Sequence, residues 1–303
     1  AAASRTDERF AVGGTGFKPI GKYDVLEEFC NCYGVVLGGY AKQDTGAFTG
    51  EFHGGGHSID SLYTGFWDKE YKTVGFIDTV AKSAVVDSLT FKGYSVGRED
   101  FGMKIGGVAT VNHGAIRNVD VDIVMDSVYQ SAGFVFRNYG SIENVSVKGK
   151  INGGRLVSGI AHLNYGTIAN AKIDAQWIGG ASAAGVAALN WGTIKNVSVK
   201  ANVKENSGFV GGIAGLNAPG GTIDKSSVNV DVSGQKSSSE GFSIYYEDGG
   251  EISVYYDVQG VAGLVAVDSG MVKNSTASGV INAKGALYVG GLIAKAYSKE
   301  LKG

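Results

Sequence analysis

The chain has 303 residues, a formal net charge of −2, and 49 glycines against only two prolines. Its hydrophobic share of 44% is enough for a continuous core, which argues against a low-complexity chain. Lys and Arg are scattered without a basic stripe, and no apolar run reaches the roughly 18 residues of a transmembrane helix, so we expect neither a nucleic-acid partner nor a membrane span.

Residues 1–21 form the first segment, in which "RFAVGGTGFKPIG" offers one short apolar strand. We expect this segment to be an incomplete first rung of a repeat array. Its apolar residues are candidates for a contact between copies of the chain: Phe10, Val12, Phe17 and Ile20.

Residues 22–46 separate "GFKPIG" from "GAFTGEF" and are predicted to be an insertion. They contain both cysteines, Cys30 and Cys32, with one residue between them. This spacing permits at best a strained local disulfide, and the second pair that a structural zinc site needs is missing. We favour plain packing or free thiols, with a local or an intermolecular disulfide as alternatives.

The stretch "HGGGH" places His53 and His57 at a spacing that could bracket a metal ion. Its glycine-rich context, without a third ligand nearby, favours a structural role for both residues. We therefore expect no metal and no other cofactor.

The words "NHGAIRN", "NYGSIEN", "NYGTIAN" and "NWGTIKN" begin at Asn112, Asn138, Asn164 and Asn190, at intervals of 26 residues, and "NAPGGTIDK" follows at Asn217. Each word precedes a stretch with period-two alternation, such as "VDVDIV", which predicts a β-strand. A unit this short cannot bury its own apolar face unless it stacks on copies of itself. The sequence thus predicts an all-β fold, a parallel β-solenoid (β-helix) of roughly 26-residue rungs over residues 47–303.

Stacking turns equivalent positions into columns along the solenoid. Two aliphatic columns are predicted to form the core: Ile116, Ile142, Ile168, Ile194, Ile223 and Val272, and Val121, Val147, Ile173, Val199 and Val228. Two Asn columns are predicted to form side-chain amide ladders: Asn112, Asn138, Asn164, Asn190 and Asn217 followed by Asp268, and Asn118, Asn144, Asn170, Asn196 and Asn274 with Lys225 as an exception.

The residue after each leading Asn is planar, which predicts a stacked aromatic ladder: His113, Tyr139, Tyr165 and Trp191. The first interpretation is that stacking stiffens the turn. The alternative is a platform that binds sugar rings or a neighbouring subunit.

The array is interrupted a second time at about residues 235–257, where "FSIYYEDGGEISVYY" predicts a projecting β-hairpin. The Tyr residues that end its two strands are candidate contacts: Tyr245, Tyr246, Tyr255 and Tyr256. The final unit, "GALYVGGLIAKAYSKELKG", stops before a complete rung, and its apolar residues are further candidates for a contact between copies: Leu287, Val289, Leu292 and Ile293.

The phrase "GGIAGLNAPGGTIDKSSV" resembles the GLUG repeat of bacterial secreted and cell-surface proteins, including regions that flank immunoglobulin A peptidases. "GAFTGEFHGGGHSIDSL" is similar to the opening rung of such arrays, with His53 where an Asp is usual. The resemblance covers roughly residues 17–295, without the peptidase, and implies a secreted or cell-surface location. The repeat is a building unit, so it implies no particular activity.

These features favour an extracellular structural protein that assembles head to tail into a filament or scaffold. An adhesin that binds a glycan or a host or surface protein through the aromatic ladder is the alternative. A polysaccharide-active enzyme is a third hypothesis, which the sequence disfavours because Asp120 and Asp122 face Ser146 and Lys148 of the next rung and form no acidic cluster. We expect no catalytic residues.

Overall fold

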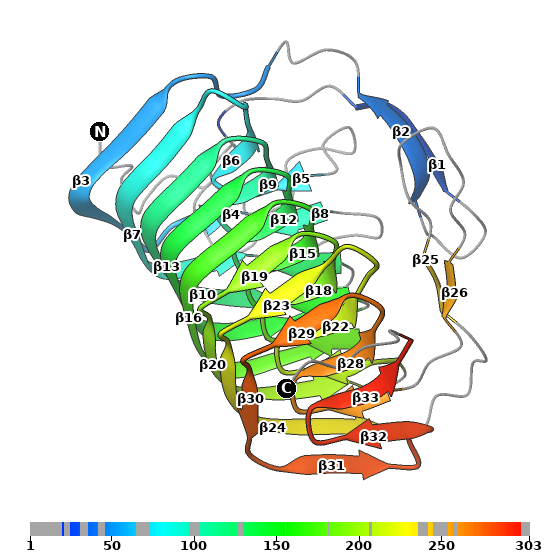
Figure 1. Ribbon diagram of the computed structural model, residues 1–303. Coiled ribbons are helices and arrows are strands. Elements are labelled where there is room, and N and C mark those ends of the chain that lie inside the picture. Colours follow the sequence, from blue (N-terminus) through cyan, green and yellow to red (C-terminus); the bar gives the residue numbers. More distant parts are fainter. Residues whose placement is uncertain are drawn as a thin grey trace.

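The computed structural model describes residues 20, 25–30, 36–41, 46–64, 73–96, 104–126, 130–154, 156–180, 182–205, 208–235, 242–244, 254–256 and 260–297. Every regular element in these ranges is a β-strand, and the described part of the chain contains no helix. The strands stack in layers along one axis, from β3 (Glu51–Asp60) at the blue end to β33 (Ile293–Ala296) at the red end (Figure 1). The predicted parallel β-solenoid is confirmed.

Three parallel sheets form the walls of the solenoid. The first consists of β5 (Thr73–Val74), β8 (Lys104–Gly106), β11 (Gln130–Ala132), β14 (Leu156–Ser158), β17 (Ser182–Ala184), β21 (Val210–Gly211), β27 (Gly260–Ala262) and β32 (Tyr288–Gly290). The second consists of β6 (Ile77–Val80), β9 (Ala109–Asn112), β12 (Val135–Asn138), β15 (Ala161–Asn164), β18 (Ala187–Asn190), β22 (Ala214–Asn217), β28 (Val265–Asp268) and β33.

The third sheet is the widest, because the chain crosses it with long strands or with pairs of short ones. It consists of β3, β4 (Tyr63–Thr64), β7 (Val85–Val96), β10 (Ala115–Asp126), β13 (Ser141–Asn152), β16 (Thr167–Gly180), β19 (Thr193–Lys195), β20 (Ser198–Glu205), β23 (Thr222–Asp224), β24 (Ser227–Gln235), β29 (Met271–Lys273), β30 (Thr276–Ser278) and β31 (Ile281–Lys284). One rung contributes to each wall in turn, as β14, β15 and β16 do.

The register brings equivalent positions of the repeat together on neighbouring strands. Ile142 pairs with Ile116 on one side and with Ile168 on the other, and none of these side chains is exposed. The second predicted column is buried in the same way: Val121, Val147, Ile173, Val199 and Val228. Both columns therefore lie in the core, as predicted, and Val272 at the end of the first column is partly buried against it.

A continuous ladder of buried amides runs along the end of the second sheet. Asn112 donates from Nδ2 to Oδ1 of Asn138 at 2.8 Å, and Asn138 donates to Asn164 at 2.8 Å. The bonds continue from Asn164 to Asn190 at 2.7 Å, from Asn190 to Asn217 at 2.8 Å, and from Asn217 to Asp268 at 2.8 Å. All six residues are completely buried, so each amide depends on its neighbour for a hydrogen-bonding partner. This confirms the first predicted ladder.

The second predicted ladder is only partly formed. Asn144 donates to Asn118 at 3.3 Å and Asn196 donates to Asn170 at 2.6 Å, but Asn170 donates to Glu143 instead of continuing the column. These side chains are exposed, so water and charged neighbours compete for their amides. What the column shares is its backbone: Asn118, Asn144, Asn170, Asn196, Lys225 and Asn274 all have φ between 49° and 54°. This left-handed conformation, which Asn tolerates well, bends the chain within the third sheet.

Neighbouring rungs approach most closely at a column of glycines. A Cβ on Gly159 would overlap the carbonyl oxygen of Gly185 on the next rung. The same holds along the column of Gly107, Gly133, Gly159, Gly185, Gly212 and Gly263, each against the next rung. A side chain at this position would force two rungs apart.

The two insertions leave the stack without shifting its register. Ile20 and Phe48 both pair with β6, through Ile77 and Val80, so the chain between them leaves one rung and returns to it. That segment contains an antiparallel pair, β1 (Val25–Cys30) and β2 (Val36–Ala41), which the sequence did not predict. The predicted hairpin is the antiparallel pair β25 (Phe242–Ile244) and β26 (Val254–Tyr256), and Figure 1 draws both pairs outside the three walls.

Replacing Asn164 with Ala should lower the free energy of unfolding by about 2–3 kcal/mol, because it removes the partner of the Asn138 amide and of the Asn190 side-chain oxygen inside the core. Asn170→Gly on the same rung is the matched control. It keeps the left-handed turn and should change stability by less than about 0.5 kcal/mol. Chemical denaturation measures both, and equal losses would contradict the role of the buried ladder.

Candidate functional site

The predicted aromatic ladder forms on the turns between the second and third sheets. The ring centroids of His113 and Tyr139 are 4.9 Å apart with 9° between the ring planes. Tyr139 and Tyr165 stack at 5.0 Å and 3°, and Tyr165 and Trp191 stack at 5.0 Å and 14°. The backbone sets this spacing, since the Tyr139 amide donates to the Asn112 carbonyl at 2.8 Å and the same bond recurs on the following rungs.

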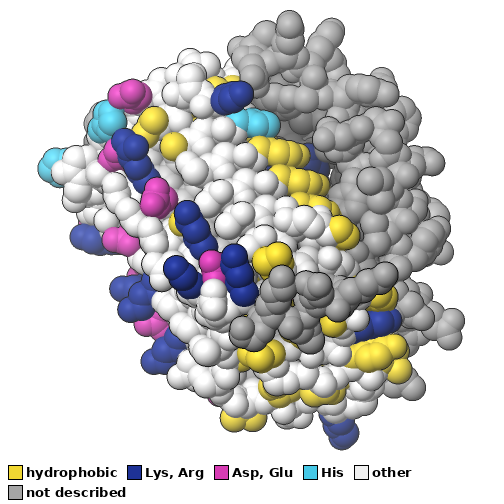
Figure 2. Space-filling view, in the orientation of Figure 1, with side chains coloured by type: hydrophobic (Ala, Val, Ile, Leu, Met, Phe, Trp, Pro, Cys, Tyr) yellow, Lys and Arg dark blue, Asp and Glu magenta, His cyan; other side chains and the backbone are white. Residues whose placement is uncertain are grey.

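The two ends of the ladder differ in their surroundings. His113 and Tyr139 are exposed, with 40% of Tyr139 accessible, whereas Tyr165 and Trp191 are half-buried. Trp191 packs at the edge of a second apolar cluster outside the main core: Leu156, Ala188, Leu189, Phe209, Leu216, Ala218, Ala266 and Val267. Figure 2 shows hydrophobic side chains in a row on this face of the solenoid, with a histidine at its head. The ladder is therefore anchored at its Trp191 end.

The stacking decides what the ladder can bind. Because the rings are nearly parallel to their neighbours and stacked on them, the faces of Tyr139 and Tyr165 are turned toward other rings. A sugar ring that binds an aromatic side chain by stacking needs an open ring face. The interior of the ladder presents ring edges instead, so its geometry favours stiffening of the turn over a sugar platform.

A column of alternating charges runs along the third sheet beside the ladder. The register aligns Asp87, Arg117, Glu143, Ala169, Lys195, Asp224 and Lys273 on successive strands. Arg117 lies 3.2 Å from Asp87, and Lys273 lies 3.9 Å from Asp224. Figure 2 shows acidic and basic side chains interleaved on this face. We did not predict this column from the sequence, although its signal is the second letter from the end of each repeat word, as in "AIRN", "SIEN" and "TIKN".

His53 begins the same column at the blue end of the stack. Its Nε2 lies 2.8 Å from Glu51 and its Nδ1 lies 3.5 Å from Asp87. The hydrogen bond with Glu51 raises the pKa of His53, while the hydrogen bond from Ser88 and, after it, Arg117 lower the pKa of Asp87. The structure thus pairs His53 with two carboxylates. Over the described ranges, no group of three or more His, Cys, Asp or Glu side chains has a metal-binding arrangement.

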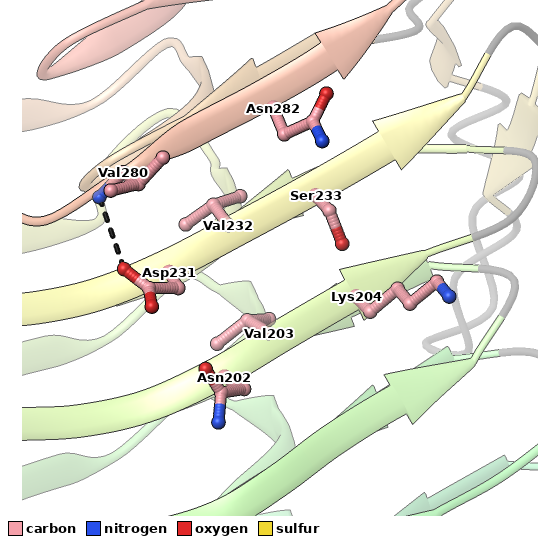
Figure 3. A pocket seen from close by; sticks show the side chains of 8 residues that line it. All are labelled: Asn202, Val203, Lys204, Asp231, Val232, Ser233, Val280 and Asn282. Carbon is pink, nitrogen blue, oxygen red and sulfur yellow. Dashed lines mark hydrogen bonds between the residues drawn. The ribbon is translucent and has the colours of Figure 1, made fainter.

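A shallow pocket of about 290 Å³ lies on the third sheet near the red end (Figure 3). Its polar lining comes from β20, β24 and β31: Asn202, Lys204, Asp231, Ser233 and Asn282. The Val280 amide donates to Asp231 Oδ1 at 3.2 Å. Asp231 is the only carboxylate that lines the pocket, and glycoside hydrolysis ordinarily needs a pair. Of the two acidic residues considered from the sequence, Asp120 and Asp122, Asp120 accepts a hydrogen bond from Ser146.

The red end of the stack exposes residues that the sequence assigns to a contact between copies. Leu287 is 59% exposed, Val289 53% and Leu292 48%, and Ile293 is half-buried. Lys295 covers part of this end, with Nζ 4.6 Å from the ring of Tyr288 and 4.8 Å from that of Tyr297. Its hydrogen bond with Tyr297 raises the pKa of Lys295. This end therefore combines an apolar surface with one anchored cation.

Several predicted positions lie outside what the structure describes. Phe10, Val12, Phe17, Cys32, Tyr245 and Tyr246 fall outside the described residues. For Cys30, Tyr255 and Tyr256 only the backbone, within β1 and β26, is described. Ile20 is described, is half-buried, and packs against the core at the blue end.

Comparisons with protein-family models, with curated proteins and with solved structures found no match to this chain. Among the described residues, no helical segment has the length and hydropathy needed to span a membrane.

Replacing Tyr165 with Ser should lower the free energy of unfolding by about 1–3 kcal/mol, because Tyr165 stacks on two neighbours and each aromatic pair contributes about 0.5–1.5 kcal/mol. Tyr165→Phe keeps the ring and serves as the control, with a loss below about 1 kcal/mol. Thermal unfolding followed by circular dichroism compares the two variants. Equal melting temperatures would show that the stack contributes nothing.

Replacing Glu51 with Gln should lower the pKa of His53 toward its ordinary value, because the carboxylate that stabilises the protonated ring is lost. The raised pKa means that the pair stabilises the fold at acidic pH and that this contribution disappears as the pH rises through the His53 pKa. NMR titration of the histidine ring protons measures the change, with His113 as an internal reference. An unchanged His53 titration in Glu51→Gln would contradict the assignment.

Proposed function

We propose that this chain is an extracellular structural protein, a β-solenoid subunit whose copies stack head to tail into a filament or surface scaffold. The extracellular location rests on the resemblance of the repeat words to GLUG repeats. The assembly rests on the ends of the described stack, where side chains of core columns are accessible.

The observation that carries the proposal is the exposure of one core column at the red end. Val289 shares its column with Val261, Val210 and Val157, which are fully buried. Val289 itself is 53% exposed, because no further rung covers it among the described residues. An open strand edge with apolar side chains is a template for another strand. A heterologous contact of this kind propagates unless its rotation closes a ring.

The other two hypotheses have less support. For the adhesin, the inner faces of the aromatic ladder are turned toward other rings and away from a ligand. For the polysaccharide-active enzyme, the pocket in Figure 3 offers one carboxylate, Asp231, without a second acid to share the chemistry. A self-assembling scaffold needs neither feature.

Replacing Val289 with Asp should abolish association, because a carboxylate would be buried between two copies without a partner. Val124→Asp is the matched control, since Val124 is 52% exposed but lies on the side wall, in β10. Light scattering and electron microscopy of the full chain should show filaments for the parent and for Val124→Asp only. A parent chain that stays monomeric at high concentration would refute self-assembly.

A further inference from the structure

The two ends of the described stack carry the same columns of the repeat. At the blue end these columns are occupied by Ile20, Phe48 and β3, and at the red end by β29, β30 and β33. A second copy could therefore continue the register of the first without any change of spacing.

The inward-facing columns match across such a junction. Val272 lies in the column of Phe52, Ala277 in that of Ile59, and Ile293 in that of Ile20. All six side chains are partly buried and pack against the core, whereas the same columns are fully buried in the interior, as at Ile142. At each end, the last side chain of each apolar column is therefore covered on one side only. Stacking of two copies would bury the exposed sides of both ends against each other.

The outward-facing columns at the two ends also permit this junction between copies. Lys273 ends the alternating charge column at the red end, and His53 with its partner Glu51 begins it at the blue end. In a neighbouring copy Lys273 would lie beside His53, and the carboxylate of Glu51, which pairs with His53, would supply the opposite charge from the adjacent column. Thr276 would lie beside Ser58, which are both small and polar.

The bulge in β3 does not block this pairing. The register of β3 shifts between His53 and His57, across Gly54, Gly55 and Gly56. A Cβ on Gly56 would meet nothing within 4 Å, so the bulge is open on that side. The red end is interrupted at the same place, between β29 and β30, where Asn274 has φ of 51°. The two copies would therefore pair in two short runs, one on each side of this interruption.

We propose that the junction between copies is an intermolecular continuation of the third sheet, in which Met271–Lys273 of one copy pairs in parallel with Glu51–His53 of the next. In this register Val272 covers Phe52, Ala277 covers Ile59 and Lys273 lies beside His53. The inference rests on the proposed head-to-tail assembly and adds the partner strand and its register.

Disulfide trapping tests this register. His53→Cys and Lys273→Cys are combined in a chain in which Cys30 and Cys32 are replaced by Ser, and electron microscopy first establishes that the Cys-free chain assembles like the parent. Adjacent parallel strands lie about 4.8 Å apart, within the Cα separation of about 4.4–6.8 Å that a disulfide needs. β3 and β29 lie at opposite ends of the third sheet, so the bond can form only between copies. We expect a ladder of covalent oligomers that reductant dissolves.

Ser58→Cys with Lys273→Cys is the matched control, because these positions lie in different columns and should give no ladder. Equal trapping by both pairs, or none by the His53 pair in chains that form filaments, would overturn the register while leaving assembly intact. Covalent dimers from Lys273→Cys alone would indicate tail-to-tail pairing and would also overturn it. Absence of filaments from the parent would refute the proposed function itself.

Discussion

A completely buried amide at one corner of every rung is the constraint on which the rest of this structure depends. The Asn112 side chain has its hydrogen-bonding partner in Asn138, one rung away, and the same relation continues to Asp268. A buried amide without a hydrogen-bonding partner costs about 1–3 kcal/mol. A rung that slipped by one residue would lose its amide hydrogen bonds to the rungs on both sides. Slippage would also turn the apolar columns outward. The ladder and the core therefore impose one common period.

Other features of the chain follow from that period. The close contact at Gly159 is possible only if a Gly recurs on every rung, because any Cβ there would overlap the neighbouring carbonyl. The alternating column that contains Asp87, Arg117 and Glu143 places opposite charges on adjacent rungs, where they attract, and like charges two rungs apart. Insertions are tolerated where the chain returns to the rung it left, as between Ile20 and Phe48.

The same regularity shapes the hypotheses about function. In-register stacking places the rings of Tyr139 and Tyr165 face to face, so these ring faces are turned toward each other. It also allows the two ends of the stack to pack against each other, because each end carries apolar side chains that are only partly buried, such as Phe52 and Val272. A repetitive solenoid whose two ends carry matching columns is suited to a connective role, and that role is the proposal we favour.

The sequence by itself determined the fold, the rung length, the core columns, the buried amide ladder and the aromatic ladder. It could do so because parallel in-register stacking converts a sequence period directly into neighbours in space, as for Ile116, Ile142 and Ile168. Only the tertiary structure decided which Asn column is continuous, since that depends on burial: the amide of Asn164 has no competing water, whereas the exposed Asn170 bonds to Glu143. The orientation of rings at the turns, the pairing of His53 with Glu51 and Asp87, and the exposure of Val289 likewise depend on what lies beside each side chain. The sequence pattern shows which residues recur, but which hydrogen-bonding or packing partner each side chain takes depends on its burial and neighbours in the packed rungs.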